Sequence, residues 1–320
     1  MKVVIPGVGG AIGTGVAQLL DREPGVSMLG IDMDPPRRRL ENVEFHRVPP
    51  PDHETTEGLI REFDPEVIIH MGIYEPHSRS NPIDAQRRTR ASTRSVFRAA
   101  MECDSLRHVV VRSGIEVYGR SRATPLRPDE HTAVRPTTRF GRTLAEVEAS
   151  AGAFAASTEV PVTVLRLAPV IGPYIPSPLG RYLRLPVVPF AAPLDGPIQL
   201  LHIDDVHGAF LAAVNRRIGG VFNIVGQGAV TGSQAARMGG RIVLPVIGPG
   251  WVLARAITGA LGAPLPEHSL EAMQRGQTAD DTKARTVLDY TPAHSTPDCV
   301  NSLYEWVRIE RLAVEHKKAA

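Results

Sequence analysis

The sequence of 320 residues is poor in features that mark several classes of protein. It contains two cysteines, Cys103 and Cys299, with no spacing that suits a disulfide framework or a zinc site, so a reducing, cytoplasmic setting is expected. The formal net charge is +2 and the basic residues are scattered, so neither nucleic acid nor a membrane is an expected partner. Of the 36 lysines and arginines only four are lysines, which we interpret as a coding bias.

A long uninterrupted hydrophobic segment is also missing. The most apolar stretch, residues 242–265, is broken by prolines, glycines and Arg255, so it is not expected to span a membrane. A helix over a smaller substrate lobe is the better interpretation. The chain enters an apolar strand almost at once, so no signal peptide is expected. With 42% apolar residues it can still build one large α/β domain, or a nucleotide-binding domain with a smaller lobe.

Residues 2–20 have the order strand, glycine turn and helix. Residues 3–5 form a short apolar run typical of a strand covered on both faces, and apolar residues then recur at helical spacing from Ile12 to Leu20. Glycines in such a turn allow a tight bend and let backbone N–H groups approach a pyrophosphate, and the helix N-terminus supplies further donors. We therefore expect a dinucleotide cofactor to bind at Gly7, Gly10, Ala11, Ile12 and Gly13.

An acidic residue follows at the distance that such a turn requires. Residues 27–31 read as the next strand, and Asp32 ends it 19 residues after Gly13. A carboxylate there can accept hydrogen bonds from both hydroxyls of an adenosine ribose and repels a 2′-phosphate, so it favours NAD over NADP. An ordinary capping or loop aspartate is the alternative. NADP would be preferred only if the three arginines at 37–39 surrounded its 2′-phosphate. The simpler interpretation is that these arginines are exposed to solvent at the start of a helix.

Strands and helices alternate through the first half of the chain, which predicts a Rossmann-type, doubly wound parallel sheet of the α/β class. Ligands bind such sheets at the carboxyl ends of the strands. The strand exits at Met71, Gly72, Ser113 and Pro169 are therefore expected to line the cofactor crevice. The expected strands lie at residues 43–48, 66–72, 106–112 and 160–168, and the expected helices at 54–63, 85–101 and 138–154.

The character of the sequence changes after residue 168. Prolines crowd residues 169–197, which indicates irregular chain and not more sheet. Residues 198–203 and 221–225 look like strands that return to the main body. We therefore predict an NAD-binding domain, residues 1–168 with 198–226 returning to it, and a smaller lobe made mainly of 169–197 and 227–320.

Several segments, taken in order, resemble the motifs of a known family. Gly7-x-x-Gly10-x-x-Gly13 is followed by residues 69–72, similar to "HLAA", by 113–119, similar to "SSxxVYG", and by 201–206 and 281–285, which resemble two later motifs. The chain is similar to the extended short-chain dehydrogenases/reductases, in particular the NAD-dependent epimerase/dehydratase group. The resemblance implies NAD as cofactor, a C-terminal substrate lobe, nucleotide-sugar substrates, and a homodimer that pairs the helices at 85–101 and 138–154.

The resemblance breaks at the residues that perform the chemistry of this family. There a Tyr-x-x-x-Lys pair and a nearby Ser or Thr handle the hydroxyl proton while NAD takes the hydride. Here the tyrosine position is Phe140, the lysine position is Leu144 and the serine position is Gly114. None of these side chains can exchange a proton or donate to a ribose. General acid–base catalysis contributes about 10²–10⁴-fold, so turnover by the ordinary route would be very slow.

Three other residues are candidate replacements. Glu116 lies one residue before the valine of the "VYG" segment, where dehydratases of this family also place a glutamate that acts as a base; a solvent-facing loop glutamate is the alternative. Tyr74 and His77 follow the fourth strand, in a loop that the family uses near the nicotinamide, although an exposed pair is the simpler interpretation. Two functions remain open: an NAD-dependent epimerase or dehydratase with an altered acid/base, or a catalytically silent NAD-binding sensor or partner protein.

Overall fold

The computed structural model describes residues 1–76, 81–121, 123–172 and 175–305. Among these residues seven strands form the main sheet in the order β11-β6-β5-β4-β1-β2-β3, and every neighbouring pair is parallel. The Rossmann-type α/β class is therefore confirmed. The strands are β1 (Lys2–Pro6), β2 (Ser27–Asp32), β3 (Val43–Arg47), β4 (Val67–His70), β5 (His108–Gly114), β6 (Val162–Leu167) and β11 (Gly220–Ile224).

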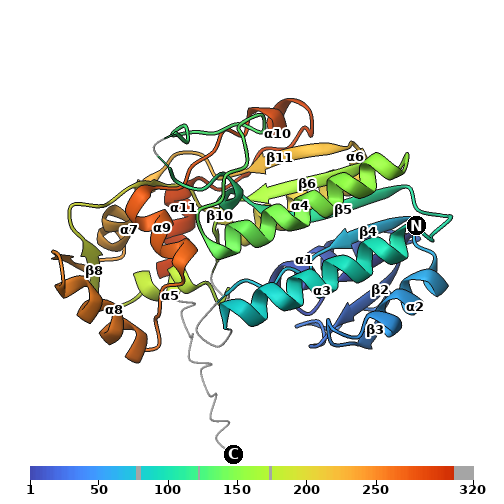
Figure 1. The fold of residues 1–320 in the computed structure, drawn as a ribbon, viewed down its shortest axis with the longest axis horizontal. Helices are drawn as coiled ribbons and strands as arrows, with labels where there is room; N and C mark the ends of the chain where they lie inside the picture. Colours follow the sequence, from blue (N-terminus) through green and yellow to red (C-terminus); the bar gives the residue numbers. More distant parts are fainter. Residues whose placement is uncertain (77–80, 122, 173–174, 306–320) are drawn as a thin grey trace, which may run out of the picture.

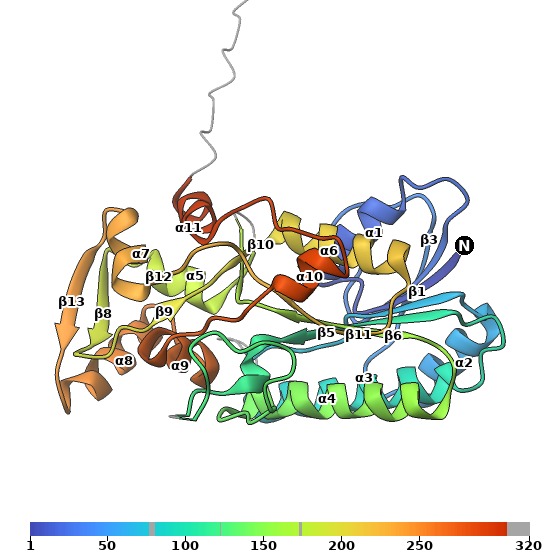
Figure 2. The ribbon, with the colours of Figure 1, turned by 90° about the horizontal axis from the view of Figure 1, so that it is seen from above.

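Helices cover both faces of this sheet (Figures 1 and 2). One face carries α1 and α6, which pack against each other, and the other carries α2, α3 and α4. Because both faces are covered, β4 and β6 consist entirely of buried residues, most of them apolar, with His70, Thr163 and Arg166 as the buried polar or charged ones. The helices are α1 (Ala11–Leu20), α2 (His53–Phe63), α3 (Pro82–Ala100), α4 (Arg139–Ser157) and α6 (Ile203–Arg216), and a short helix η1 (Ile115–Tyr118) follows β5.

A smaller lobe with a hydrophobic core of its own lies at the carboxyl end of the sheet (Figure 1). Tyr182, Phe190, Met273 and Leu303 are among the side chains of this second core. The lobe and the connecting chain contain β7 (Val170–Ile171), α5 (Pro178–Leu183), β8 (Val187–Ala191), β9 (Pro197–Ile198), β10 (Leu201–His202), β12 (Val230–Thr231), α7 (Gly232–Met238), β13 (Ile242–Val246), α8 (Gly250–Ala260), α9 (Glu267–Arg275), α10 (Thr282–Thr286) and α11 (Thr296–Tyr304).

Two element predictions in this region are wrong. Residues 242–265 are not one helix, because β13 pairs in parallel with β8 and α8 begins only at Gly250. The run Ile-Val-Leu-Pro-Val favours extended chain, and a proline is tolerated in a strand at a sheet edge. Residues 198–203 are not one strand, because β9 ends at Ile198 and the chain turns into α6 at Ile203.

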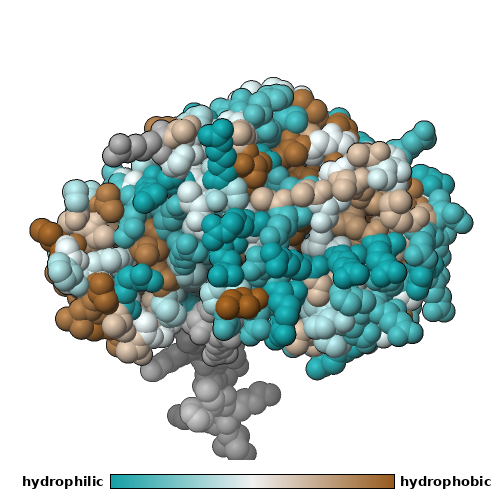
Figure 3. Space-filling model, viewed as in Figure 1, coloured by the Kyte–Doolittle hydropathy of each residue, from teal (hydrophilic) through white to brown (hydrophobic). Residues whose placement is uncertain are grey.

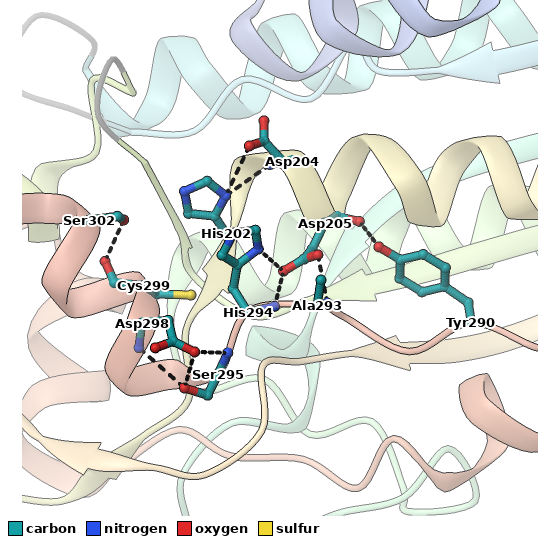
Figure 4. Close-up of polar contacts among 10 residues, drawn as sticks. All are labelled: His202, Asp204, Asp205, Tyr290, Ala293, His294, Ser295, Asp298, Cys299 and Ser302. Carbon is teal, nitrogen blue, oxygen red and sulfur yellow. Dashed lines mark hydrogen bonds and ion pairs between the residues drawn. The ribbon is translucent and has the colours of Figure 1, made fainter.

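A polar cluster fixes the start of α6 (Figure 4). The N-cap is His202, whose Nδ1 accepts the Asp204 N–H at 3.3 Å. The two aspartates occupy the first turn, where negative charge favours the helix dipole. Buried Asp205 accepts the N–H groups of Ala293 and His294 at 2.8 and 3.0 Å, so it anchors the C-terminal segment to the sheet domain.

A buried ion pair lies behind the exits of β5 and β6. Arg166 Nη2 is 2.6 Å from Glu148 Oε2, and its Nη1 donates to the Tyr118 hydroxyl at 2.8 Å. The Ser113 hydroxyl donates to Glu148 Oε1 at 2.6 Å. The network joins two strands, η1 and α4, so it holds the strand exits that carry the candidate site.

Candidate cofactor groove and active site

Two glycines of the turn after β1 are required by the packing of the protein itself. Gly7 has φ +92°, and a Cβ built on it would lie 2.5 Å from the carbonyl carbon of Met71. A Cβ on Gly13 would lie 2.2 Å from the Gly7 carbonyl oxygen. The start of α1 and the exit of β4 therefore approach the turn more closely than any side chain would allow.

Gly10 has no comparable reason to be a glycine. A Cβ there would meet the Gly7 oxygen at 3.5 Å, an ordinary contact, and no other atom of the described residues within 4 Å. Gly10 is exposed at the N-cap of α1, which has no side-chain cap and no acidic residue in its first turn. The N–H groups at this helix N-terminus are thus available to an anion that approaches the backbone closely, as a pyrophosphate does.

Alanine substitutions separate these two kinds of glycine. Gly10→Ala is expected to keep the melting temperature of the wild type but weaken NAD binding by about tenfold, because the methyl group obstructs the pyrophosphate. Gly13→Ala is expected to cost about 1–3 kcal/mol of stability, because its Cβ must displace the Gly7 carbonyl. Titration calorimetry and thermal unfolding measure the two effects. Unchanged NAD affinity in Gly10→Ala would contradict the assignment of this turn.

Asp32 ends β2 with its carboxylate in the same groove. Its Oδ2 accepts the Gly9 N–H at 2.9 Å and its Oδ1 accepts the Met33 N–H at 2.6 Å. Burial raises the pKa of Asp32, and these backbone donors oppose the rise. Oδ1 also accepts the Asp34 N–H at 3.4 Å, so Oδ2 is the oxygen that keeps a free lone pair for a ribose hydroxyl. Arg37 also lines the groove, whereas Arg38 and Arg39 are not among the described residues that line it.

Asp32→Asn tests the choice between the two dinucleotides. NAD binding is expected to weaken by about tenfold, because a hydrogen bond to a charged group contributes about 1.5–3 kcal/mol and the amide offers one acceptor atom. NADP affinity should not fall in parallel, because the repulsion of its 2′-phosphate is removed. Calorimetric titration of both dinucleotides measures the ratio, with Asp34→Asn in the same groove as the matched control. A ratio equal to that of the wild type would argue against a ribose contact.

The groove encloses a cavity of about 450 Å³ between the glycine turn and the exits of β4 and β5. Ser113 and Pro169, which were also expected to line it, line a smaller cavity next to it instead. The predicted cofactor residues in its walls are Gly7, Gly10, Ala11, Ile12, Gly13, Asp32, Met71 and Gly72.

The smaller cavity measures about 20 Å³, which is room for about one water molecule. Glu75 and Arg112 belong to the walls of both cavities, and their side chains form an ion pair with 3.6 Å between Oε2 and Nη2. Gly114, Phe140 and Leu144 line the small cavity as well. The structure thus brings together the three residues that stand at the expected catalytic positions.

Glu116 lies in this small cavity. A Cβ built on Gly114 would be 2.2 Å from Glu116 Oε2 and 3.1 Å from the Leu144 side chain, so the carboxylate fills the space that a serine at position 114 would need. Burial raises the pKa of Glu116, while the charge of His268 and a hydrogen bond from the Gln277 side chain oppose the rise. A carboxyl group with a raised pKa in a closed site is suited to proton transfer.

Sequence reasoning missed the residues that face Glu116 from the small lobe. His268 of α9 lies with Nε2 3.2 Å from Glu75 Oε1, and its ring centroid is 4.8 Å from that of Phe140. His268 and Gln277 are buried. No spacing in the sequence relates them to Glu116, because they reach it only when α9 packs against the N-terminal end of α4.

The other two candidate replacements do not join this cluster. Tyr74 lines the wider groove and not the small cavity, and the Arg88 guanidinium lies 6.0 Å from its ring centroid. Burial raises the pKa of Tyr74 and the nearby charge of Asp32 adds to the rise, so its phenol stays protonated at neutral pH. His77 lies outside the described residues.

The sheet, the glycine turn and Asp32 define a dinucleotide-binding protein of the Rossmann class. The model of the NAD dependent epimerase/dehydratase family matches residues 3–225, and the chain belongs to that family. NAD as the cofactor is consistent with this membership. An uncharacterized protein of Mycobacterium tuberculosis (strain H37Rv) is 30% identical over 251 residues, which cover 77% of this chain and 67% of that protein.

Two solved structures share the fold over nearly the whole chain. UDP-glucose 4-epimerase of Thermotoga maritima, solved with UDP-glucose, has a TM-score of 0.73 and 21% identity, and the match covers 95% of this chain and 98% of that one. UDP-glucuronic acid 4-epimerase of Bacillus cereus, solved with NAD, also has a TM-score of 0.73, with 20% identity and coverage of 95% and 100%.

Proposed function

We propose that the protein is an NAD-binding epimerase/dehydratase of the extended short-chain dehydrogenase type that acts on a nucleotide sugar with Glu116 as a non-standard acid/base. The observation that carries this proposal is the position of the Glu116 carboxylate, which lies against Gly114 and Leu144 in the cavity that Phe140 also lines. An ionisable group therefore stands where the expected catalytic side chains are missing. The UDP-sugar epimerases that share the fold support the substrate class.

The residues present fit this chemistry. The exposed backbone at Gly10 and the carboxylate of Asp32 suit the pyrophosphate and ribose of NAD, which supplies the hydride acceptor when bound. The Glu116 carboxylate takes the proton of a sugar hydroxyl as the C–H electron pair leaves as hydride, and it returns that proton when the hydride comes back. The Gln277 hydrogen bond orients the carboxylate, and both this bond and the interaction with His268 favour its charged form.

One observation favours a second candidate function. A cavity of about 20 Å³ admits no sugar ring, and the Glu75–Arg112 ion pair stands where it meets the groove. Turnover therefore requires Glu75 and Arg112 to separate from each other, and the small lobe to move away from the sheet, when substrate binds. If they do not, the chain binds NAD without catalysis, as a sensor or a partner of another protein.

The experiment that separates the two functions is a titration of NAD into the purified chain, followed by UDP-glucose, UDP-galactose, UDP-glucuronic acid and dTDP-glucose. Reduced nicotinamide is followed by absorbance, and the sugars are analysed by NMR because an epimerase returns the hydride. A new isomer or a dehydrated sugar supports the enzyme. Tight NAD binding with every sugar unchanged supports the silent protein, and no binding of NAD would overturn both.

His268→Asn is expected to move the pH dependence of turnover. Removing the positive charge of His268 lets burial raise the pKa of Glu116 further, and a general base works only when it is deprotonated. The acid limb of kcat/KM against pH should therefore shift to higher pH, with smaller changes at alkaline pH. Rates across the pH range with any active nucleotide sugar measure the shift, and His46→Asn on β3 is the control. If the acid limb did not move, His268 would not influence the proton transfer by Glu116.

We also propose a cytoplasmic homodimer in which α3 and α4 pair with the same helices of a second copy. A cavity of about 440 Å³ lies between the two helices, with Phe97, Val147 and Phe154 in its walls. Met101 in the same wall is 54% exposed, and a second copy would cover it. Sedimentation velocity over a range of concentrations tests the dimer, which a monomer at all concentrations would exclude.

A further inference from the structure

The small lobe ends in an apolar surface that no described residue covers. We call it the α8 surface, and Figure 3 shows it where α8 lies, at the lower left of the molecule. Its side chains are 47% to 79% exposed. Thr258 is the single buried residue of α8, a helix that lies wholly within the described chain. The residues of the surface are Ile242, Leu244, Ile247, Val252, Leu253, Ile257 and Leu261.

The helix presents these side chains in register. Leu253, Ile257 and Leu261 are spaced by four residues, so they lie in one row along α8 and beyond its last turn. Residues 247–249, which link β13 to α8, are exposed as well, and so is Gly250 at the start of the helix. Together they form the outer end of the lobe in Figure 2, away from the cofactor groove. A surface domain rarely leaves an apolar area of this kind open unless something binds it.

The segment of the chain that carries the α8 surface has formal charges of one sign. Between Asp205 and Glu267 the sequence has no aspartate or glutamate, although the whole chain is nearly neutral. Arg255 on α8 and Arg237 at the end of α7 are exposed. Asp195 of the same lobe accepts the Ser233 N–H at 3.1 Å, so its carboxylate already has a hydrogen-bond donor within the lobe. The net charge of the whole chain conceals this local imbalance.

We propose that the α8 surface binds an anionic lipid bilayer. Exposed aliphatic side chains with arginines as their charged neighbours match a layer that is apolar just beneath negative headgroups. Trp251 at the start of α8 is the residue type that lipid interfaces favour. The protein lies on the bilayer and does not span it, since no helix of the described chain is long and apolar enough to cross. This inference is independent of the proposed catalysis.

Flotation of the full chain with lipid vesicles tests the proposal. We expect the chain to float with vesicles of phosphatidylglycerol and phosphatidylcholine at low salt, and to bind vesicles of phosphatidylcholine alone at least tenfold less. In a Trp306→Phe background Trp251 is the only tryptophan, and its emission should shift to the blue on binding. Leu253→Asp with Ile257→Asp should reduce binding by more than tenfold, because both side chains lose their transfer into the interface.

A matched control excludes a general effect of added charge. Leu126→Asp changes a side chain that is 65% exposed, against 64% for Leu253, on the loop between η1 and α4. It should leave vesicle binding unchanged, and all variants should keep the NAD affinity and melting temperature of the wild type. No flotation of the wild type, equal binding to both kinds of vesicle, or a change of oligomeric state in Leu253→Asp without vesicle binding would overturn the proposal.

Discussion

Glu116→Gln is expected to lower kcat by about 10²–10⁴-fold while NAD binds as in the wild type, because the amide keeps the shape of the side chain but cannot accept a proton. Glu116 lies in the small cavity and not in the walls of the wider groove, so the cofactor contacts should survive. Stopped-flow or steady-state rates with the active nucleotide sugar, and calorimetry with NAD, measure the two quantities. Glu62→Gln, on the exposed face of α2, is the control.

The pH profile makes the same prediction more specific. Burial raises the pKa of Glu116, so the wild type should lose activity as the pH falls through that raised pKa and the carboxylate becomes protonated. The residual activity of Glu116→Gln should lack this acid limb. Equal rates for wild type and Glu116→Gln across the pH range would mean that Glu116 is not the acid/base. The central argument for an enzyme would then be lost.

Arg166→Met is expected to destabilise the folded protein by about 3–5 kcal/mol, because it leaves the carboxylate of Glu148 buried without its partner. Arg166 is 4% exposed and Glu148 is 11% exposed, so water cannot replace the lost bonds. Among the described residues, the Ser113 hydroxyl would be the remaining hydrogen-bond donor to the Glu148 carboxylate. Urea unfolding gives the free energy, and the slope of the transition shows whether the folded state has stayed compact.

The double variant Arg166→Met with Glu148→Leu isolates the cost of the unpaired charge. A buried ion pair replaced by apolar side chains of similar volume is often neutral in stability, so the double variant should recover most of the loss. Tyr118 keeps its hydrogen bond to Asn223 Oδ1 at 2.8 Å in both variants. A double variant as unstable as Arg166→Met would mean that packing, and not the unpaired carboxylate, sets the effect.

Much of the cofactor domain could be predicted from the sequence because its signals are local. The apolar run of β1, the glycines after it and Asp32 lie within 32 residues, and each follows from the backbone geometry of one strand, one turn and one helix. The absence of ionisable groups at Gly114, Phe140 and Leu144 is also a property of the sequence. What the sequence could not show is that a Cβ would fit without a clash at Gly10 but not at Gly13.

The catalytic half of the candidate site and the α8 surface were decided by tertiary structure. The sequence favoured Glu116 over Tyr74 and His77 as the replacement, but only the packing of α9 against α4 gave Glu116 a closed cavity and His268 as a neighbour. The apolar stretch at 242–265 read as a covering helix, whereas the structure leaves it as an uncovered strand and helix. Apolar periodicity shows which residues prefer to avoid water, but contacts between distant segments determine whether anything in the chain covers them.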